Sequence, residues 1–424
     1  MTHIRMTCHV NPKLNRHPTI LITNQVCQLN MGDALILGGT LKLLKDMVGK
    51  AKITVLSFNP DIDTERCPVR VLGMLGASLK SAPALLLLLL RALLWRAIKT
   101  LHQDGSWLLD HPILQQYMNS DVIIVRGGDT LTSDYGLASL ASHLTSILLA
   151  ESLKKPIVLL GHTVGPFGIL KYLSTFIFDR VNLIILRETL SREHLRLNRS
   201  KTRVAVTVDM SLHLEICENR TVKRALLEEG FHEGGKTVGI AVSQLASSFM
   251  KHPKDLRIQQ ETFVTLMARL IDYIVNNLDV NVLLTPTVLG PGRNDDRIIS
   301  RLIYDMVARK DRVKVIVQEY RPEEMTAIIG SCEVFIGSRM HACVAALANC
   351  VPTVALGYGH KFDGVIGETF GQSDFIVKVA DLDWNLLLSK VNQVWQERNQ
   401  IRERLQAKNR DLDTKKNQNL ILLK

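Results

Sequence analysis

Short runs of apolar, often β-branched residues alternate along the chain with longer segments that carry apolar residues at helical spacing. Such runs are typical of buried strands, and strands that alternate with helices predict parallel sheets covered by helices on both faces. We therefore expect an α/β fold with Rossmann-like parallel sheets. The predicted strands are Thr19–Thr23, Lys52–Phe58, Asp121–Val125, Pro156–Gly161, Leu183–Arg187, Val204–Val208, Thr237–Val242, Val280–Thr285, Val313–Val317, Glu333–Gly337 and Pro352–Leu356.

The length of the chain indicates two domains, because 424 residues are many for a single hydrophobic core. A charged, helix-prone segment that contains several glycines separates the two halves of the pattern, and we place the boundary there. A long polar helix, which can pack back across the first lobe, follows the second half. The divisions are a polar N-terminal extension (1–18), a first lobe (19–214), a linker (215–236), a second lobe (237–382) and a C-terminal helix (383–424).

An arginine and a histidine stand where one of these strands gives way to a helix. Arg339 and His341 closely follow the strand Glu333–Gly337, and the next helix is predicted from about His341 to Asn349. In open α/β sheets, ligands bind beyond the carboxyl ends of the strands, near helix N-termini that attract anions. The pair suits an anionic substrate that must be protonated. The alternative is a structural arginine paired with a carboxylate and a histidine that caps the helix.

Polar turns also follow two strands of the first half. Asn30 and Asp33 come after the first strand, where they either face a substrate or cap the following helix. Asp129 and Asp134 come after a glycine pair at the end of another strand. They could accept hydrogen bonds from sugar hydroxyls or cap the next helix. We expect Asn30, Asp129 and Asp134 on the side of an acceptor.

The next two strands end in a histidine and an arginine. His162 lies on a strand-to-loop turn, where a histidine is more often structural than functional, and Arg187 ends the strand after it. Arg187 and Arg339 would bring two cations from the two halves to one crevice. A small dianion requires such a pair.

The charge of the chain narrows the classes of partner. The net charge is +11 and the pI is about 9.3, which suits nucleic acid, an anionic membrane surface or acidic substrates. We exclude nucleic acid, because no recognition motif is present and aromatic residues make up only 5%. The seven cysteines contain no CxxC pair and predict neither a zinc site nor a disulfide framework. With no apolar leader in the first residues, we expect a cytoplasmic protein.

One leucine-rich segment allows contact with a membrane. The apolar run 84–90 is too short to span a bilayer, and Arg91, Arg96 and Lys99 follow it. A helix over 84–99 could lie in the interface, with cations toward anionic lipid, and would make the protein peripheral on the inner face of the membrane. The alternative is a core helix of the first lobe.

Six ordered segments together resemble the polysaccharide pyruvyl transferase family. They read NMGDALILGG, IIVRGGDTLTSDYG, PIVLLGHTVGPFG, LIILRETLS, VTVDMSL and VFIGSRMHACVAALANCVPTVALGYGHKFDG, and the resemblance covers about residues 19 to 371. It implies two Rossmann-like lobes, similar to B-type glycosyltransferases. It also implies transfer of the enolpyruvyl group of phosphoenolpyruvate to two hydroxyls of a sugar, with a pyruvate ketal and phosphate as products. The acceptor would belong to a cell-surface polysaccharide or its lipid-linked precursor.

The resemblance also implies roles for particular residues. Arg187, Arg339 and His341 match family positions that bind the donor, with His162 nearby. The text NQVCQLNMGD departs from the family in lacking an aromatic or glycine-rich lead-in, so the identity of the acceptor does not follow.

The chemistry of the donor is consistent with these roles. Phosphoenolpyruvate has a carboxylate and a phosphate, which Arg187 and Arg339 could clamp. His341 would protonate the methylene carbon as a general acid, and Asp33 or Asp129 would accept a proton from a sugar hydroxyl. Arginines and helix N-termini can neutralise the leaving phosphate, so we expect neither a metal ion nor a cofactor.

Two other functions stay open at this point. A B-type glycosyltransferase that uses a nucleotide sugar would share the two lobes, although the Arg-x-His pair favours a smaller donor. A non-catalytic, membrane-associated assembly protein could use the helix over 84–99 as an anchor, but this leaves the arginines and histidines at the strand ends unexplained.

Overall fold

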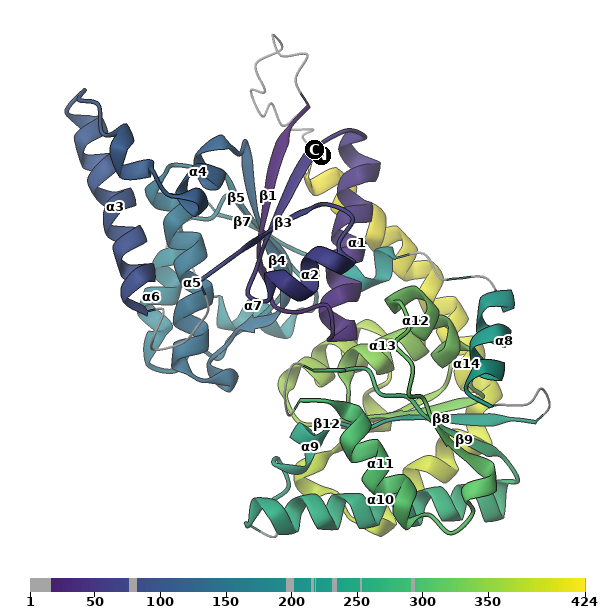
Figure 1. Ribbon diagram of the computed structural model, residues 1–424. Helices are drawn as coiled ribbons and strands as arrows, with labels where there is room; N and C mark the ends of the chain where they lie inside the picture. The colour runs from purple at the N-terminus through teal and green to yellow at the C-terminus, as the bar shows by residue number, and fades with distance from the viewer. Residues whose placement is uncertain are drawn as a thin grey trace.

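Two parallel β-sheets, each covered by helices, form two lobes in the computed structural model (Figure 1). The strand order is β3-β2-β1-β4-β5-β6-β7 in the first sheet and β10-β9-β8-β11-β12-β13 in the second. Every pairing recorded between these strands is parallel, which confirms the predicted fold class. The structure describes residues 17–75, 82–195, 202–214, 217, 219–230, 235–251, 254–290 and 294–423.

The first lobe places helices on both faces of its sheet, because its central strands are apolar on both sides and must be covered. Its main elements are β1 (Thr19–Gln25), α1 (Met31–Val48), β2 (Lys52–Ser57), α2 (Pro60–Arg66), β3 (Arg70–Gly73), α3 (Ala82–Thr100), α4 (Pro112–Asn119), β4 (Val122–Leu131), α5 (Leu137–Ser152), β5 (Ile157–Val164), α6 (Lys171–Phe178), β6 (Leu183–Leu186), α7 (Leu190–His194) and β7 (Arg203–Val206). Helices α3 to α6 share one hydrophobic core, whereas α1 packs in a separate core on the opposite face.

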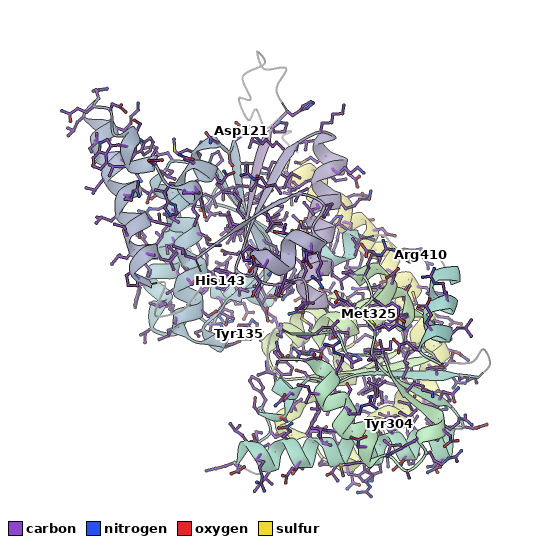
Figure 2. The ribbon with its side chains drawn as sticks, in the orientation of Figure 1. Asp121, Tyr135, His143, Tyr304, Met325 and Arg410 are labelled. Atoms are coloured by element: carbon purple, nitrogen blue, oxygen red, sulfur yellow. The ribbon has the colours of Figure 1, made fainter. Side chains whose placement is uncertain are left out.

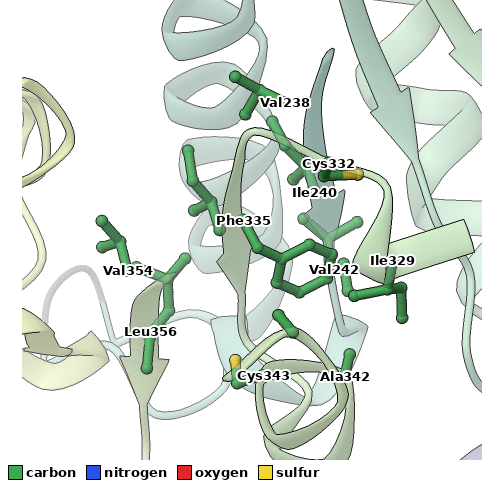
Figure 3. Packing of buried hydrophobic residues seen from close by; sticks show 14 of the residues in the cluster. Val238, Ile240, Val242, Ile329, Cys332, Phe335, Ala342, Cys343, Val354 and Leu356 are labelled. Atoms are coloured by element: carbon green, nitrogen blue, oxygen red, sulfur yellow. The ribbon is translucent and has the colours of Figure 1, made fainter. Parts of the chain in front are cut away.

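The second lobe repeats this arrangement around a single core. Its main elements are α8 (Asn219–Glu228), β8 (Thr237–Ala241), α9 (Gln244–Ser247), α10 (Leu256–Leu278), β9 (Asn281–Leu284), α11 (Asp296–Met306), β10 (Val313–Val315), α12 (Pro322–Gly330), β11 (Val334–Gly337), α13 (Met340–Ala348), β12 (Thr353–Gly357) and β13 (Ile376–Lys378). Phe335 of β11 lies fully buried in this core, near Val242, Ile329 and Ala342 (Figure 3). A Cβ on Gly239 would lie 2.7 Å from both the Phe335 ring and Cys332 Sγ, so a larger residue here would force these side chains to move.

All the predicted strands are present, with shifts at their ends. Strand β4 runs on to Leu131, so that Asp129 lies in the strand and not after it. Helix α1 begins at Met31, because the side chain of Asn30 accepts a hydrogen bond from the Gly32 N–H at 3.0 Å and so caps the helix. The short strands β3 and β13 were not predicted.

The long C-terminal helix joins the two lobes. Helix α14 (Trp384–Leu423) buries Leu387, Val391 and Val394 in the core of the second lobe. Its last turns pack on the core of the first lobe that surrounds α1. There, Asn419 Nδ2 lies 3.0 Å from His213 Nε2. Helix α14 therefore fastens one lobe to the other.

The leucine-rich segment forms α3, which packs on α5 at the outer side of the first lobe (Figure 1). Leu85, Leu88 and Ala92 are buried, so one face of the helix belongs to the core. Leucines on the other face are exposed. None of the helices in the described part of the chain is both long and apolar enough to cross a membrane.

Candidate active site

A cavity of about 360 Å³ lies between the two lobes. It forms at the switch point of each sheet, where the chain connections after two neighbouring parallel strands run toward opposite edges of the sheet. These strands are β1 and β4 in the first lobe and β8 and β11 in the second. Ligands bind at such switch points in open α/β sheets. Tyr135 and His143, which line the cavity, lie on the edge of the first lobe that faces the second (Figure 2). The predicted site residues that line it are Asn30, Asp33, Asp129, Arg339 and His341.

His341 reaches across the cleft to the first lobe. Its Nε2 lies 3.5 Å from Asp209 Oδ2 and 3.5 Å from Arg187 Nη1, and both of these groups belong to the first lobe. The other side of the ring lies against the start of α1, where a Cβ on Gly32 would be 2.3 Å from His341 Nδ1. Glycine at position 32 therefore allows the imidazole to sit at the N-terminus of α1.

Arg187 and Asp209 form a buried ion pair behind this imidazole. Arg187 Nη1 donates to Asp209 Oδ2 at 2.6 Å, and its Nε donates to Thr163 Oγ1 at 2.8 Å. Burial alone would raise the pKa of Asp209, but Arg187 and His341 outweigh it and hold the pKa well below its ordinary value. Arg187 has no exposed surface. It therefore lies behind His341 and not on the cavity wall, where a direct clamp on the donor would need it.

Arg339 lines the cavity and is held by a carboxylate. Its Nε and Nη2 both donate to Asp296, the latter at 2.6 Å from Oδ1, and Nη2 also donates to Asn294 Oδ1 at 3.1 Å. Asp296 in turn accepts the backbone N–H groups of Thr287 and Val288. The guanidinium is thus fixed in place with 13% of its side chain exposed.

Asp33 is a half-buried carboxylate on the opposite wall. Its Oδ1 accepts a hydrogen bond from Arg126 Nη2 at 2.7 Å, and Arg126 itself is fully buried. Burial raises the pKa of Asp33 above its ordinary value, although the charges of Arg126 and His341 oppose the shift. A raised pKa suits a group that takes up a proton and gives it back.

Lys361 supplies a second cation from the second lobe. Its Nζ donates to Asp129 Oδ2 at 2.6 Å and to the Tyr135 hydroxyl at 2.8 Å, and both partners belong to the first lobe. Burial would lower the pKa of Lys361, but the charge of Asp129 outweighs it and raises the pKa well above its ordinary value. Asp129 is therefore engaged with a cation across the cleft.

Besides Arg187, two other predicted residues lie outside this cavity. Asp134 lines a neighbouring cavity of about 440 Å³, where its carboxylate is 3.9 Å from His360 Nδ1. His162 is fully buried in the sheet, and its Nε2 donates to the Val125 carbonyl oxygen at 3.1 Å. The two cavities share Asp129, Tyr135, Tyr358 and Lys361.

Four charged residues of the site were missed. Asp209, Lys361 and Arg126 each follow a predicted strand. The expectation that ligand-binding residues follow the carboxyl ends of strands, which identified Arg339, would therefore also have identified them. Asp296 follows no predicted strand, and no signal in the sequence pointed to it. Among the described residues, no three His, Cys, Asp or Glu side chains are placed to hold a metal ion.

Known proteins share both the sequence pattern and the fold. Residues 30–360 match the polysaccharide pyruvyl transferase family. The amylovoran biosynthesis protein AmsJ of Erwinia amylovora is 25% identical over 396 residues, which cover 88% of this chain and 91% of that protein.

Solved structures of B-type glycosyltransferase-like fold share the architecture. A glycosyltransferase from Rickettsia africae superimposes with a TM-score of 0.58 at 12% identity, over 96% of each chain. HepE from Anabaena, in complex with UDP, gives 0.56 at 13% identity, over 96% of this chain and 99% of that one. The match over residues 30–360 shows that this chain belongs to the polysaccharide pyruvyl transferase family.

Proposed function

We propose that this protein transfers the enolpyruvyl group of phosphoenolpyruvate to two hydroxyls of a sugar in a cell-surface polysaccharide or its lipid-linked precursor. The product is a pyruvate ketal, and phosphate is released. One observation carries the proposal: Arg339, Lys361 and His341 line the same cavity as the carboxylates of Asp33 and Asp129. Family membership and the likeness to a protein of amylovoran biosynthesis support a polysaccharide acceptor.

The cations would hold the two anionic groups of the donor. Arg339 offers a planar guanidinium, already oriented by Asp296, to the carboxylate or the phosphate. Lys361 binds the other group as a point charge once the donor competes with Asp129 for it. Arg187 lies behind His341, where it is paired with Asp209, and holds that carboxylate in place without contact with the donor.

The reaction balances with groups of the cleft. His341 delivers a proton to the methylene carbon of phosphoenolpyruvate, and the neighbouring carbon gains positive character. One sugar hydroxyl adds to that carbon, the carbon–oxygen bond to phosphate breaks, and the second hydroxyl adds to close the ketal. Of the two hydroxyl protons, one replaces the proton that His341 delivered and one leaves with phosphate. Asp33, whose pKa is raised by burial, accepts the hydroxyl proton that then replaces the one delivered by His341.

Asp209 would orient the acid. It lies on the Nε2 side of the ring, and its lowered pKa keeps it a carboxylate. We therefore assign the transferred proton to Nδ1, on the side of the ring that faces α1.

The experiment is calorimetry with the purified protein, followed by turnover with phosphoenolpyruvate and a panel of glycans that carry vicinal or 4,6-hydroxyl pairs. We expect phosphoenolpyruvate to bind, and phosphate release to depend on the glycan and to match the appearance of a ketal methyl signal by NMR. UDP serves as the control ligand, since a structural neighbour was solved with UDP. Binding of UDP without binding of phosphoenolpyruvate would overturn the proposal in favour of a nucleotide-sugar donor.

A further inference from the structure

The outer face of α3 exposes a row of leucines to solvent. Leu86, Leu87 and Leu90 are 67%, 55% and 51% exposed, and Leu93 and Leu94 are 45% exposed. The opposite face already packs on α5, so these leucines have no part in the core. An apolar row of this length on one helix marks an interaction surface.

A second exposed apolar group lies on α6 and the turn before it. Ile169 and Tyr172 are 81% and 85% exposed, and Leu173 and Phe176 are 42% and 50% exposed. Helix α6, like α3, packs on α5, and both helices lie on the side of the sheet opposite α1 (Figure 1). We refer to these two groups of residues together as the apolar face.

Basic residues accompany the apolar face. Helix α3 carries Arg91 and Lys99, as well as Arg96, which pairs with Glu151 of α5; it has no acidic residue, and α6 begins with Lys171. Arg91 donates to main-chain carbonyl oxygens of the segment that follows the helix. These contacts fix the guanidinium in place, and the carbonyl groups carry no charge that would neutralise it. Leucines with flanking cations and amphipathic aromatic side chains are typical of surfaces that enter the bilayer interface.

We propose that the apolar face docks on an anionic phospholipid bilayer. A second copy of this chain would bring like charges on α3 together, whereas an anionic lipid surface neutralises them. The exposed aromatic groups of Tyr172 and Trp107 suit the depth of the lipid headgroups; Trp107 is 65% exposed and lies beside the middle of α3, where its carbonyl oxygen accepts from Arg91.

The position of the apolar face also indicates the class of acceptor, and this step rests on the proposed function. Ile169 lies three residues after Pro166, which lines the neighbouring cavity of about 440 Å³. That cavity shares Asp129, Tyr135 and Lys361 with the candidate active site. Docking would hold this cavity beside the bilayer. The acceptor is then a glycan attached to a membrane lipid, which enters from the side of the neighbouring cavity.

Vesicle sedimentation with the full-length protein tests the docking surface without reference to activity. We expect the parent to sediment with vesicles of phosphatidylcholine and phosphatidylglycerol, and much less with phosphatidylcholine alone. The variant Leu86→Ser/Leu90→Ser/Leu93→Ser should bind the anionic vesicles at least about tenfold more weakly, because each change removes most of a buried apolar side chain from the lipid interface. Ile169→Ser/Tyr172→Ser should show a similar loss.

The matched control is Ile298→Ser/Leu302→Ser/Met306→Ser, which removes three exposed apolar side chains from α11 of the second lobe. It should bind vesicles like the parent. Equal sedimentation of the parent with both kinds of vesicle, none with either, or parental binding by the α3 variant would each overturn the proposal. A change of oligomeric state in the α3 variant, without any vesicle binding by the parent, would assign the face to self-association.

Phosphoenolpyruvate binding by the α3 variant separates the two proposals. Parental donor affinity together with lost vesicle binding supports the docking surface whatever the reaction proves to be. Vesicle binding by a parent that does not bind phosphoenolpyruvate leaves the docking surface standing and overturns only the proposed function, together with the class of acceptor.

Discussion

His341 contacts groups of opposite charge that both come from the other lobe. Asp209 and Arg187 lie at the same nitrogen, 3.5 Å away in each case, and Asp209 is itself paired to Arg187. A buried pair of this kind is nearly neutral overall. It can orient the ring while leaving the proton available to a substrate.

Replacing His341 by Gln tests its role as the acid. Glutamine keeps a hydrogen-bond donor but cannot deliver a proton at working pH, so we expect kcat to fall by about 10²–10⁴-fold while phosphoenolpyruvate binding changes little. The measurements are kcat, donor affinity, and deuterium incorporation into the ketal methyl in heavy water. An unchanged rate of incorporation would move the acid to another residue.

Arg339 is tested together with Asp296, because removal of the arginine alone leaves a buried carboxylate without its cation. The double variant Arg339→Gln/Asp296→Asn removes both charges. We expect it to fold and to bind phosphoenolpyruvate more weakly by about 2–5 kcal/mol, the usual cost of losing one partner of a buried charge pair. Calorimetry gives the affinity, and the thermal midpoint reports folding.

The control is Asp296→Asn alone, which keeps the guanidinium and should stay closer to parental affinity. Parental affinity in the double variant would remove Arg339 from the donor site.

The expectation that ligand-binding residues follow the carboxyl ends of strands predicted where the site residues lie along the chain, but not which of them form pairs. It brought Asp33, Asp129, Arg339 and His341 to one cavity. It could not predict that Arg187 lies behind His341, since burial depends on how the two lobes meet. Asp129 likewise pairs with Lys361 because of an approach between lobes that no local pattern encodes.

At the scale of elements, the strands missed from the sequence are both at sheet edges. Strands β3 and β13 each pair with a single neighbour and are short and partly exposed. They therefore lack the continuous apolar run that marks a central parallel strand. The residue that caps α1 was also left open, because Asn30 and Asp33 are both good N-caps and only the backbone shows that Asn30 acts.

The N-terminus of α1 gives a prediction about the contact between lobes. Alanine is normally preferred to glycine within a helix. In Gly32→Ala, however, the added carbon would lie 2.3 Å from His341 Nδ1, so the imidazole must move. We expect kcat/KM to fall by about 10²-fold, the effect of a displacement near 1 Å in a catalytic group, with little loss of thermal stability.

Gly38→Ala in the same helix is the control, because its Cβ would meet only the end of the flexible Leu214 side chain. Equal activity of Gly32→Ala and Gly38→Ala would show that the position of His341 does not limit the reaction.

At the scale of the molecule, several contacts hold the lobes together around the cleft. Lys361 pairs with Asp129 inside it, and Arg66 of α2 pairs with Glu319 of the second lobe. Helix α14 adds a continuous connection. The cleft is therefore bounded on more than one side by contacts between the lobes.

Buried histidines should make the whole protein sensitive to mild acid. Burial lowers the pKa of His162 to about 3 and that of His143 to about 4, against about 6.5 in an unfolded chain. As the pH falls below about 6.5, the unfolded chain binds protons that the folded protein does not, so stability decreases. Well below that pH, each histidine lowers the free energy of unfolding by up to about 1.4 kcal/mol per pH unit.

His162→Gln should remove the pH dependence that His162 adds to stability, because glutamine does not titrate. The hydrogen bond is kept, since glutamine can still donate to the Val125 carbonyl oxygen. Urea unfolding between pH 7 and pH 4.5 measures the free energy of unfolding for parent and variant. We expect a shallower dependence on pH in the variant. The same dependence in both proteins would mean that His162 carries a proton in the folded state.

The path of α14 also sets an order of events during synthesis. Leu420, Leu422 and Leu423 pack on the core that surrounds α1, yet they are translated after the entire second lobe. At about 5–20 residues per second, the first lobe waits roughly 10–40 s on the ribosome before these side chains arrive. During that interval this face of the nascent lobe stays uncovered, and a chaperone that binds apolar surface has one defined place and time to act.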